Sequence, residues 1–293
     1  MNKIKSYFWG YVRRFIYQRP NILYPLALKG MLDNDSLSLS TVAIKIKKTL
    51  SVGMKGEIIK MPADNSTLSS LFSNGDWHAD TINLLKSNLN KEKTYQVFDI
   101  GANVGLVSRQ FLYSGIKIES LHCVEPDNIN HAFLRDNLSV FDNVEIKFYQ
   151  FALSEMEGEQ NFYKDKNNIG NYSLNSSAVK QDAVNVSKVK TESTSKFFSK
   201  KVTSDNLIIK FDTQGNDEKL VTLIPKKVLS KVDCMIIEVW GIEGKSYNEE
   251  SFRNIISSYK NIYFNSKKTT NIDEIINFSK SKNRTFKDLI LFN

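Results

Sequence analysis

The sequence predicts an α/β protein built on a doubly wound, mostly parallel β-sheet. Short apolar segments alternate with longer segments of helical periodicity, and this alternation is typical of parallel sheets with right-handed crossovers. One apolar segment leads into a turn between Gly101 and Gly105, and a helical segment begins at once. With 293 residues, 41% of them hydrophobic, the chain is long enough for one such domain with appendages.

The first strand and its turn have the pattern of a nucleotide-type site. Residues Val97–Gly105 read VFDIGANVG, an apolar run ending in an acid, followed by two glycines four residues apart. Glycine lets the backbone approach a ligand closely, and the N–H groups at the start of the predicted helix Leu106–Tyr113 can bind its polar atoms. The next run, Leu121–Val124, ends in Glu125, and an acid there typically hydrogen-bonds ribose hydroxyls. We therefore expect an adenosine-bearing cofactor.

The later elements continue the alternation of strands and helices. The segment Lys164–Lys201 interrupts it: it is polar and rich in Ser, Asn and Lys, so we expect a long excursion over the ligand face, such as a lid. The elements predicted are the strands Gln96–Ile100, Ser120–Val124, Val144–Phe148, Leu207–Phe211 and Cys234–Val239, then the helix Glu249–Tyr259, the strand Asn261–Phe264, the helix Ile272–Ser281 and the strand Lys287–Phe292.

The spacing of the glycines favours one cofactor over another. A dinucleotide fingerprint is G-x-G-x-x-G, whereas Gly101 and Gly105 stand in D-x-G-x-N-x-G, with Val104 where a further glycine is sought. Asp99 would repel a pyrophosphate but attract the ammonium and sulfonium of S-adenosyl-L-methionine, so the pattern favours that cofactor over NAD. A P-loop is also absent, because the stretch Gly244–Ser246 resembles its end but lacks the glycine required five residues earlier.

Six blocks, in order and at plausible spacing, resemble the FkbM family of S-adenosylmethionine-dependent methyltransferases, which mostly methylate oxygen. The resemblance covers roughly Gly53 to Asn293. It implies the class I methyltransferase (Rossmann-like) fold, with a seven-stranded sheet whose last strand is inserted antiparallel. Gln214 stands where many relatives carry Glu, so the role of that acid is not carried over. The blocks are Val97–Gly105, Val124–Asp127, Ala152–Ser154, Asn168–Ser173, Ile209–Gly215 and Ile236–Val239.

The expected cofactor contacts follow the strand ends, where open α/β sheets bind their ligands. Asp99 and the turn should face the methionine part of the cofactor. Glu125 should bind the ribose, with Asp127 as a second candidate, and the segment 151–154 should frame the adenine. The full set is Asp99, Gly101, Ala102, Asn103, Gly105, Glu125, Asp127, Ala152, Leu153, Ser154 and Asp212.

Three side chains are candidates for the chemistry of methyl transfer to a hydroxyl. Such a transfer needs an aligned oxygen and a base that removes its proton. Asp212 ends the fourth strand and can hold the cofactor's ammonium, contact the acceptor or take its proton. Glu238 ends the fifth strand and is either catalytic or a structural acid that binds loop N–H groups. His78, beside Trp77 in a loop-like segment, is the one histidine expected over the site.

We expect no bound metal. No cluster of His, Cys and Asp shows metal-ligand spacing in the sequence. A site in which Asp212 and another acid hold a Mg²⁺ ion, as in some catechol methyltransferases, is an alternative that no pattern in the sequence supports.

Positive charge is concentrated in the N-terminal part. Residues 1–60 hold 11 Lys and Arg against 3 Asp and Glu, and the remainder holds 29 of each sign, for a net charge of +8. We therefore divide the chain into a basic, largely helical extension over 1–60 and the methyltransferase domain over 61–293. Ile4, Phe8 and Phe15 fall on one arc of a predicted helix, which either packs on the domain or makes a peripheral contact with an anionic membrane.

Composition indicates a cytoplasmic protein. Cys123 and Cys234 fall in predicted buried strands, so we expect two core thiols in a reducing compartment. No apolar run reaches the roughly 18 residues that span a bilayer, and the N-terminus lacks the pattern of a signal peptide. The inner face of the membrane is the expected location if the N-terminal helix binds lipid.

The acceptor and two rival functions stay open. The resemblance implies a hydroxyl of a sugar in a cell-surface glycan or glycolipid, or of a secondary metabolite. A nucleic-acid methyltransferase would share the cofactor half, but the catalytic half has no basic-aromatic stripe, so we expect no nucleic-acid partner. A non-catalytic S-adenosylmethionine-binding protein or membrane adaptor is the other alternative, which the intact Asp99, Glu125 and Asp212 disfavour. The oligomeric state is not predicted.

Overall fold

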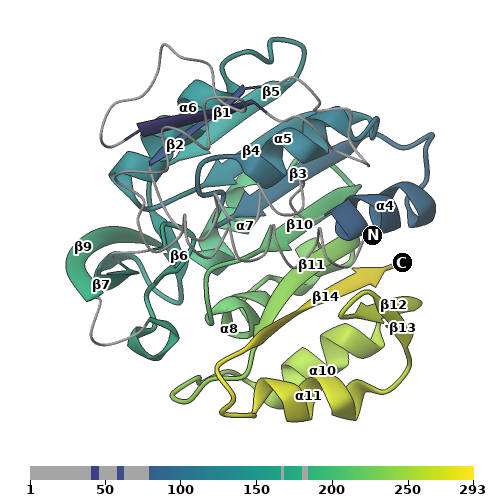
Figure 1. Cartoon of the computed structure of the whole chain (residues 1–293). Helices are drawn as coiled ribbons and strands as arrows, with labels where there is room; N and C mark the ends of the chain where they lie inside the picture. The colour runs from purple at the N-terminus through teal and green to yellow at the C-terminus, as the bar shows by residue number, and fades with distance from the viewer. Residues whose placement is uncertain (1–40, 46–57, 63–78, 166–167, 180–183) are drawn as a thin grey trace, which may run out of the picture.

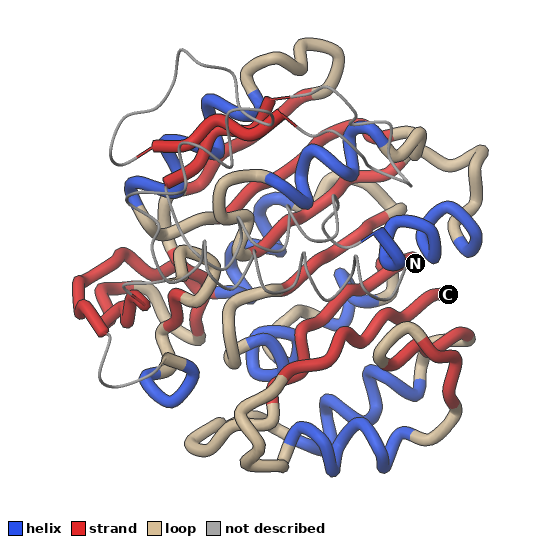
Figure 2. The backbone as a smooth tube through the Cα atoms, viewed as in Figure 1, coloured by secondary structure: helices blue, strands red, loops and turns tan. Residues whose placement is uncertain are grey.

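The protein folds around an eight-stranded β-sheet with helices on both faces (Figure 1, Figure 2). The computed structural model describes residues 41–45, 58–62, 79–165, 168–179 and 184–293. The strands lie in the order β13–β12–β14–β11–β10–β3–β4–β5. Their bounds are β3 Tyr95–Ile100, β4 Ile118–Val124, β5 Glu145–Tyr149, β10 Leu207–Phe211, β11 Val232–Trp240, β12 Asn261–Phe264, β13 Lys267–Thr269 and β14 Phe286–Phe292.

The order and direction of the strands are those expected of the class I methyltransferase fold. Strands β5, β4, β3, β10 and β11 run parallel, and β14 lies between β11 and β12, antiparallel to both. The predicted fold class is therefore confirmed. The described residues add one strand to the expected seven, because β13 pairs with β12 across a two-residue turn. Asn265 and Ser266 both have positive φ there, as a tight hairpin turn of this kind requires.

Helices cover the two faces of the sheet in two groups. The helices α4 (Ala79–Asn88), α5 (Leu106–Tyr113) and α6 (Asn128–Leu138) bury apolar side chains on one face. Successive strand residues point to opposite faces, so Val97 joins this core while Phe98 joins the other. The helices on the second face are α7 (Thr194–Lys201), α8 (Asp217–Thr222), α9 (Lys226–Leu229), α10 (Glu249–Ser257) and α11 (Ile272–Ser279).

The parallel strands read as continuous apolar runs because both of their faces are buried. All residues of β3 and β10 are buried, and these strands coincide closely with their predicted bounds. Cys123 and Cys234 are free thiols within this sheet and are fully buried, as expected.

The segment Lys164–Lys201, expected as a long excursion over the ligand face, contains regular secondary structure. It contains β8 (Tyr172–Ser173), β9 (Val184–Ser193) and α7. With β6 (Ala152–Ser154) and β7 (Gly158–Asp165), these strands form a second sheet in the order β6–β9–β7–β8, at the left of Figure 1. The strands were not foreseen because half of the β9 residues are exposed, so backbone pairing with β7 holds a strand whose sequence gives only a weak apolar signal.

Part of the expected N-terminal extension forms strands. β1 (Thr41–Lys45) pairs antiparallel with β2 (Ile58–Pro62), and Ile59 and Met61 are buried in the core beside α6. The expected boundary at residue 60 thus falls inside β2. The amphipathic helix expected near the N-terminus lies outside the described residues. No helix in the described part of the chain is both long enough and apolar enough to cross a membrane.

Candidate functional site

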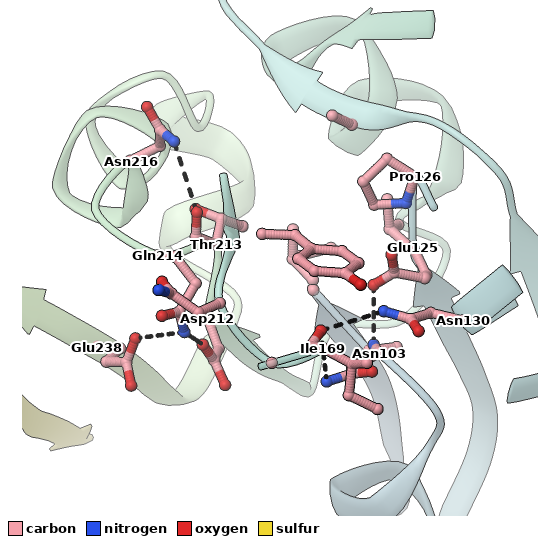
Figure 3. A pocket seen from close by; sticks show the side chains of 18 of the residues that line it. Asn103, Glu125, Pro126, Asn130, Ile169, Asp212, Thr213, Gln214, Asn216 and Glu238 are labelled. Atoms are coloured by element: carbon pink, nitrogen blue, oxygen red, sulfur yellow. Dashed lines mark hydrogen bonds between the residues drawn. The ribbon is translucent and has the colours of Figure 1, made fainter. Parts of the chain in front are cut away.

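A cavity of about 270 Å³ opens at the carboxyl ends of β3, β4, β10 and β11. This is the edge at which open α/β sheets bind ligands. Gly101 follows β3, Glu125 follows β4, Asp212 follows β10 and Glu238 lies near the end of β11, and all four line the cavity. In Figure 3, Glu125 lies on one side of the cavity, and Asp212 and Glu238 lie together on the other.

The glycine turn brings backbone atoms close to the cavity. Gly101 has φ +79°, and a Cβ atom there would lie 2.0 Å from the backbone oxygen of Asp212, so only glycine fits. Gly105, with φ +88°, begins α5. The backbone N–H groups of Gly101 and Ala102 donate to the oxygen of Val124 at 2.9 and 3.0 Å, which fixes the turn against β4.

Glu125 is a buried carboxyl group at the edge of this turn. The backbone N–H of Asn103 donates to its Oε2 at 2.9 Å, and that of Asp127 donates to its Oε1 at 2.8 Å. Burial raises the pKa of Glu125 to about 8, although these two backbone hydrogen bonds act in the opposite direction. Each oxygen is held in place by one donor, and a carboxylate oxygen can accept more than one. Glu125 is therefore oriented to bind two further donors, such as neighbouring hydroxyls.

Two asparagines close the same side of the cavity. The side-chain amides of Asn103 and Asn130 both donate to the backbone oxygen of Ile169, at 3.5 and 3.2 Å (Figure 3). Their side-chain oxygens are buried and accept no hydrogen bond from the described residues. The segment 168–172 lines the cavity, so this part of the expected excursion does lie over the ligand face. The two oxygens are acceptors for donors that a ligand would supply.

Asp99 is not placed as the sequence suggests. Its side chain is fully buried and does not line the cavity. It accepts a hydrogen bond from Ser108 Oγ at 2.6 Å and pairs with the amine of Lys210, with 2.9 Å between Oδ1 and Nζ. Asp99 on β3 lies directly opposite Lys210 on the neighbouring strand β10, so the two side chains pair. The carboxylate of Asp99 therefore influences the cavity through the amine of Lys210.

Lys210 and Asn130 are cavity residues that sequence reasoning missed. Lys210 lies 4% exposed in the cavity lining, 3.3 Å from the oxygen of Gly101 and 3.5 Å from Asp212 Oδ2. Burial alone lowers the pKa of Lys210, but the charges of Asp99 and Asp212 raise it well above its ordinary value, so the amine stays protonated. The one signal for Lys210 in the sequence was a lysine inside the otherwise apolar strand LIIKF.

Asp212, Gln214 and Glu238 form a hydrogen-bonded cluster on the other side of the cavity (Figure 3). The side-chain nitrogen of Gln214 donates to Asp212 Oδ1 at 2.6 Å and to Glu238 Oε2 at 2.9 Å. An amide nitrogen has two hydrogens, so it can serve both carboxyl groups at once. Gln214 thus separates two acids that would otherwise repel each other, and it does so with a φ of +57°.

Glu238 is the more deeply buried of the two acids. Its Oε2 also accepts the indole N–H of Trp240 at 2.5 Å. Burial, together with the negative charges of Asp212 and Asp217, raises the pKa of Glu238 well above its ordinary value. A carboxylate with a raised pKa is a stronger base. Glu238 is therefore better suited than an ordinary acid to accept a proton from a hydroxyl group.

The structure brings some of the other expected residues to the cavity and leaves others outside it. Ala102, Asn103, Ala152 and Leu153 line it, whereas Gly105, Asp127 and Ser154 do not. Asp127 caps α6 by accepting the N–H groups of residues 129 and 130, and its carboxylate pairs with Lys164. Ser154 binds the backbone oxygen of residue 156 at 2.8 Å. His78 lies outside the described residues.

The described residues contain no group of three or more His, Cys, Asp and Glu side chains that could hold a metal ion. In the pair of Asp212 and Glu238, the amide of Gln214 bridges the two carboxyl groups. A neutral donor therefore occupies the position between the two carboxyl groups.

Comparisons with known proteins gave structural similarities. No protein-family model and no curated protein matches the sequence. A methyltransferase FkbM from Methylobacillus flagellatus KT is 14% identical with a TM-score of 0.31, covering 78% of this chain and 56% of that one. A SAM-dependent methyltransferase from Agrobacterium tumefaciens is 11% identical with a TM-score of 0.42, covering 90% and 74%. A TehB-like SAM-dependent methyltransferase from Corynebacterium glutamicum is 8% identical with a TM-score of 0.35, covering 78% and 94%.

The chain thus spans little more than half the length of the FkbM methyltransferase that it matches. At these identities and TM-scores, the function proposed below rests on the geometry of the site.

Proposed function

We propose that this protein is an S-adenosylmethionine-dependent methyltransferase that transfers a methyl group to a hydroxyl oxygen. The observation that carries the proposal is the two-sided cavity at the strand ends. One side holds Glu125 and the glycine turn, which suit an adenosine-bearing ligand, and the other holds the cluster of Asp212, Gln214 and Glu238. The strand order, with β14 inserted antiparallel, supports the same class of enzyme.

The residues around the cavity fit the parts of S-adenosyl-L-methionine. Glu125 can accept hydrogen bonds from the two ribose hydroxyls, and Ala152 and Leu153 offer an apolar surface to the adenine. The buried oxygens of Asn103 and Asn130 can accept hydrogen bonds from its amine or hydroxyl groups. On the far side, the carboxylate of Asp212 can pair with the ammonium group of the methionine part.

When bound, the cofactor supplies a methyl group already activated by a positively charged sulfur. The protein must then orient the acceptor oxygen and remove its proton. Glu238 is the group whose raised pKa suits proton removal. Asp212, held by Gln214 and close to Lys210, can orient the hydroxyl. Glu238 would take the proton of the acceptor hydroxyl while Asp212 holds that oxygen in line with the methyl group.

The acceptor that we propose is a hydroxyl of a sugar, in a cell-surface glycan or glycolipid, or of a secondary metabolite. The family resemblance supports this class of acceptor. The division into a basic N-terminal extension and a methyltransferase domain, with peripheral membrane contact through the extension, belongs to the same proposal and rests on the charge of residues 1–60.

Calorimetry of the full chain with S-adenosylmethionine and with NAD tests the cofactor. We expect S-adenosylmethionine to bind and NAD not to bind. Glu125→Gln keeps the shape of the side chain but presents an NH₂ group to the ribose hydroxyls, so it should weaken binding by about 1–3 kcal/mol. Glu159→Gln, on the exposed part of β7, is the matched control and should bind as the wild type does. Equal binding by the Glu125 variant, or preference for NAD, would contradict the proposal.

A further inference from the structure

A second cavity lies beyond the carboxyl ends of β10 and β11, next to the first. Its volume is about 250 Å³, and Leu174 and Asn216 line both cavities, so these side chains lie between the two spaces. Asp212 and Glu238 belong to the same two strand ends. The second cavity therefore adjoins the half of the first cavity in which we place the chemistry.

Three parts of the chain build this second cavity. Residues 215–219 follow β10, residues 244–247 follow β11, and Tyr163 with residues 174–176 come from the second sheet and its connection. Hydrogen bonds join the second sheet to the loop after β10: Ser173 Oγ donates to the oxygen of Gln214 at 2.7 Å, and Asn216 Nδ2 donates to Ser173 Oγ at 3.2 Å. These hydrogen bonds fix the second sheet against the loop that lines the cavity.

The two cations that line the second cavity each pair with a carboxylate. Lys245, 5% exposed, pairs with Glu218, 1% exposed, and also donates to the backbone oxygen of Trp240 and to Ser279 Oγ. Lys219 pairs with Glu155 at 2.9 Å. An anion such as a phosphate would find no uncommitted positive charge among these groups. The Gly244–Ser246 stretch thus differs from a phosphate-binding loop in its spacing and in having its lysine paired with Glu218.

The remaining lining suits a molecule with many hydroxyl groups. Asn175 and Ser246 offer polar atoms, and Tyr163 and Tyr247 offer rings with an apolar body and a polar end. Glu218 also lines the cavity, and its buried oxygen Oε2 accepts no hydrogen bond from the described residues. A lining that combines such polar groups with aromatic rings matches a sugar ring, which has both polar and apolar faces.

We propose that this second cavity is the acceptor subsite and that it binds an uncharged saccharide, whose hydroxyl reaches the Asp212–Gln214–Glu238 cluster past Leu174 and Asn216. This inference rests on the proposed methyltransferase function and assigns the place and the charge of its acceptor. A sugar phosphate should have no advantage over the corresponding neutral sugar.

Saturation-transfer NMR with the full chain tests this inference, using a panel of neutral methyl glycosides and the matching sugar phosphates, with S-adenosylhomocysteine present. Ser246 is exposed and lines the cavity, so Ser246→Trp fills it from the rim without touching the first cavity. We expect neutral glycosides to bind the wild type, and the variant to bind them at least about tenfold more weakly. Ser257→Trp, on the exposed side of α10, is the matched control and should leave binding unchanged.

Calorimetry with S-adenosylmethionine separates this test from that of the function. Both tryptophan variants should bind the cofactor as the wild type does, and Ser246→Leu supplies a smaller obstruction if the tryptophan disturbs folding. Cofactor binding without any glycoside binding, wild-type glycoside binding by both Ser246 variants, or clear preference for the sugar phosphates would each overturn the acceptor subsite. Failure of the cofactor to bind the wild type would instead overturn the proposed function.

Discussion

At the scale of single residues, the site depends on buried charges that hold one another in place. Lys210 and Asp99 are 4% and 0% exposed, and the charge of each side chain is balanced mainly by the charge of the other. Removing one partner of a buried pair leaves an uncompensated charge, which costs far more than the pair itself contributes. Lys210 is also 3.5 Å from Asp212, so this internal pair is linked directly to the catalytic side of the cavity.

Lys210→Met should therefore lower the free energy of unfolding by about 3–5 kcal/mol, measured by urea denaturation. Lys147→Met is the control, because Lys147 pairs with Glu145 at the surface, where such a pair contributes about 0–1 kcal/mol. Adding Asp99→Asn to Lys210→Met should restore part of the loss, since the isolated charge is then removed. If the Lys210 variant unfolds at the urea concentration of the wild type, the pair does not have the structural role given to it here.

Glu238 should give the reaction a pH dependence. A general base acts in its deprotonated form, so kcat should rise with pH through a pKa well above the ordinary carboxyl value, because burial and nearby carboxylates raise that pKa. Glu238→Gln should lower kcat by about 10²–10⁴-fold and flatten this limb of the profile. A wild-type profile that is flat above pH 5, or a variant that keeps the rising limb, would remove Glu238 as the base and leave Asp212 or His78 as candidates.

At the scale of elements, the segment 168–172 closes the cavity because two asparagines hold one of its backbone oxygens. Asn130, on α6, is 2% exposed and donates to Ile169 at 3.2 Å. The segment lies between β7 and the end of β8, and the side chain of Asn103 donates to the same backbone oxygen. Its position over the ligand thus depends on side chains that come from the cofactor-binding half.

Asn130→Ala should loosen this segment and weaken cofactor binding. Losing a buried hydrogen bond to a backbone oxygen costs about 1–3 kcal/mol, so we expect a measurable loss of affinity by calorimetry. Hydrogen exchange at residues 168–172 should become faster, while exchange in β3 and β10 should not change. Asn161→Ala, on the exposed part of β7, should leave both readouts unchanged. Unaltered exchange in the Asn130 variant would show that other contacts hold the segment.

At the scale of the whole molecule, one edge of the sheet gathers acids whose pKa values are raised by folding. Burial raises the pKa of Glu125 and of Asp217 to about 8, and that of Glu238 well above its ordinary value. In the unfolded chain these groups lose their protons near their ordinary values. The folded protein therefore binds more protons than the unfolded chain up to about pH 8, and its stability falls as pH rises in this range.

We expect the melting temperature of the protein without ligand to fall between about pH 6.5 and pH 8. The window starts near pH 6.5 because of His122, whose pKa burial lowers to about 4. Below its ordinary pKa this residue binds more protons in the unfolded chain than in the folded protein, so there it makes stability rise with pH. Differential scanning calorimetry across this range measures the slope. Glu125→Gln should reduce the slope, because the neutral amide does not titrate. A melting temperature that rises from pH 6.5 to pH 8 would contradict the charge states assigned to these acids.

Much of the main sheet could be predicted because its strands are buried on both faces. β10 and β12 have the bounds expected from the sequence, and the turn of Gly101 and Gly105 was found from the glycines alone. β9 could not be found in this way, since its exposed side chains give no apolar pattern. β13 was missed because three residues after a turn carry no periodic signal.

By itself, the sequence determined the succession of the buried strands along the chain, the ligand edge of the sheet and the acid at the end of β4, since these follow from local patterns of apolar residues, glycines and acids. Only the tertiary structure decided which polar groups meet. Lys210 pairs with Asp99, which is 111 residues away, and Gln214 bridges Asp212 to Glu238, which is 24 residues further along. Partners of this kind depend on which strands lie side by side and on which residues face one another across them. Local pattern does not contain that information, because register and burial arise only when the whole sheet has formed.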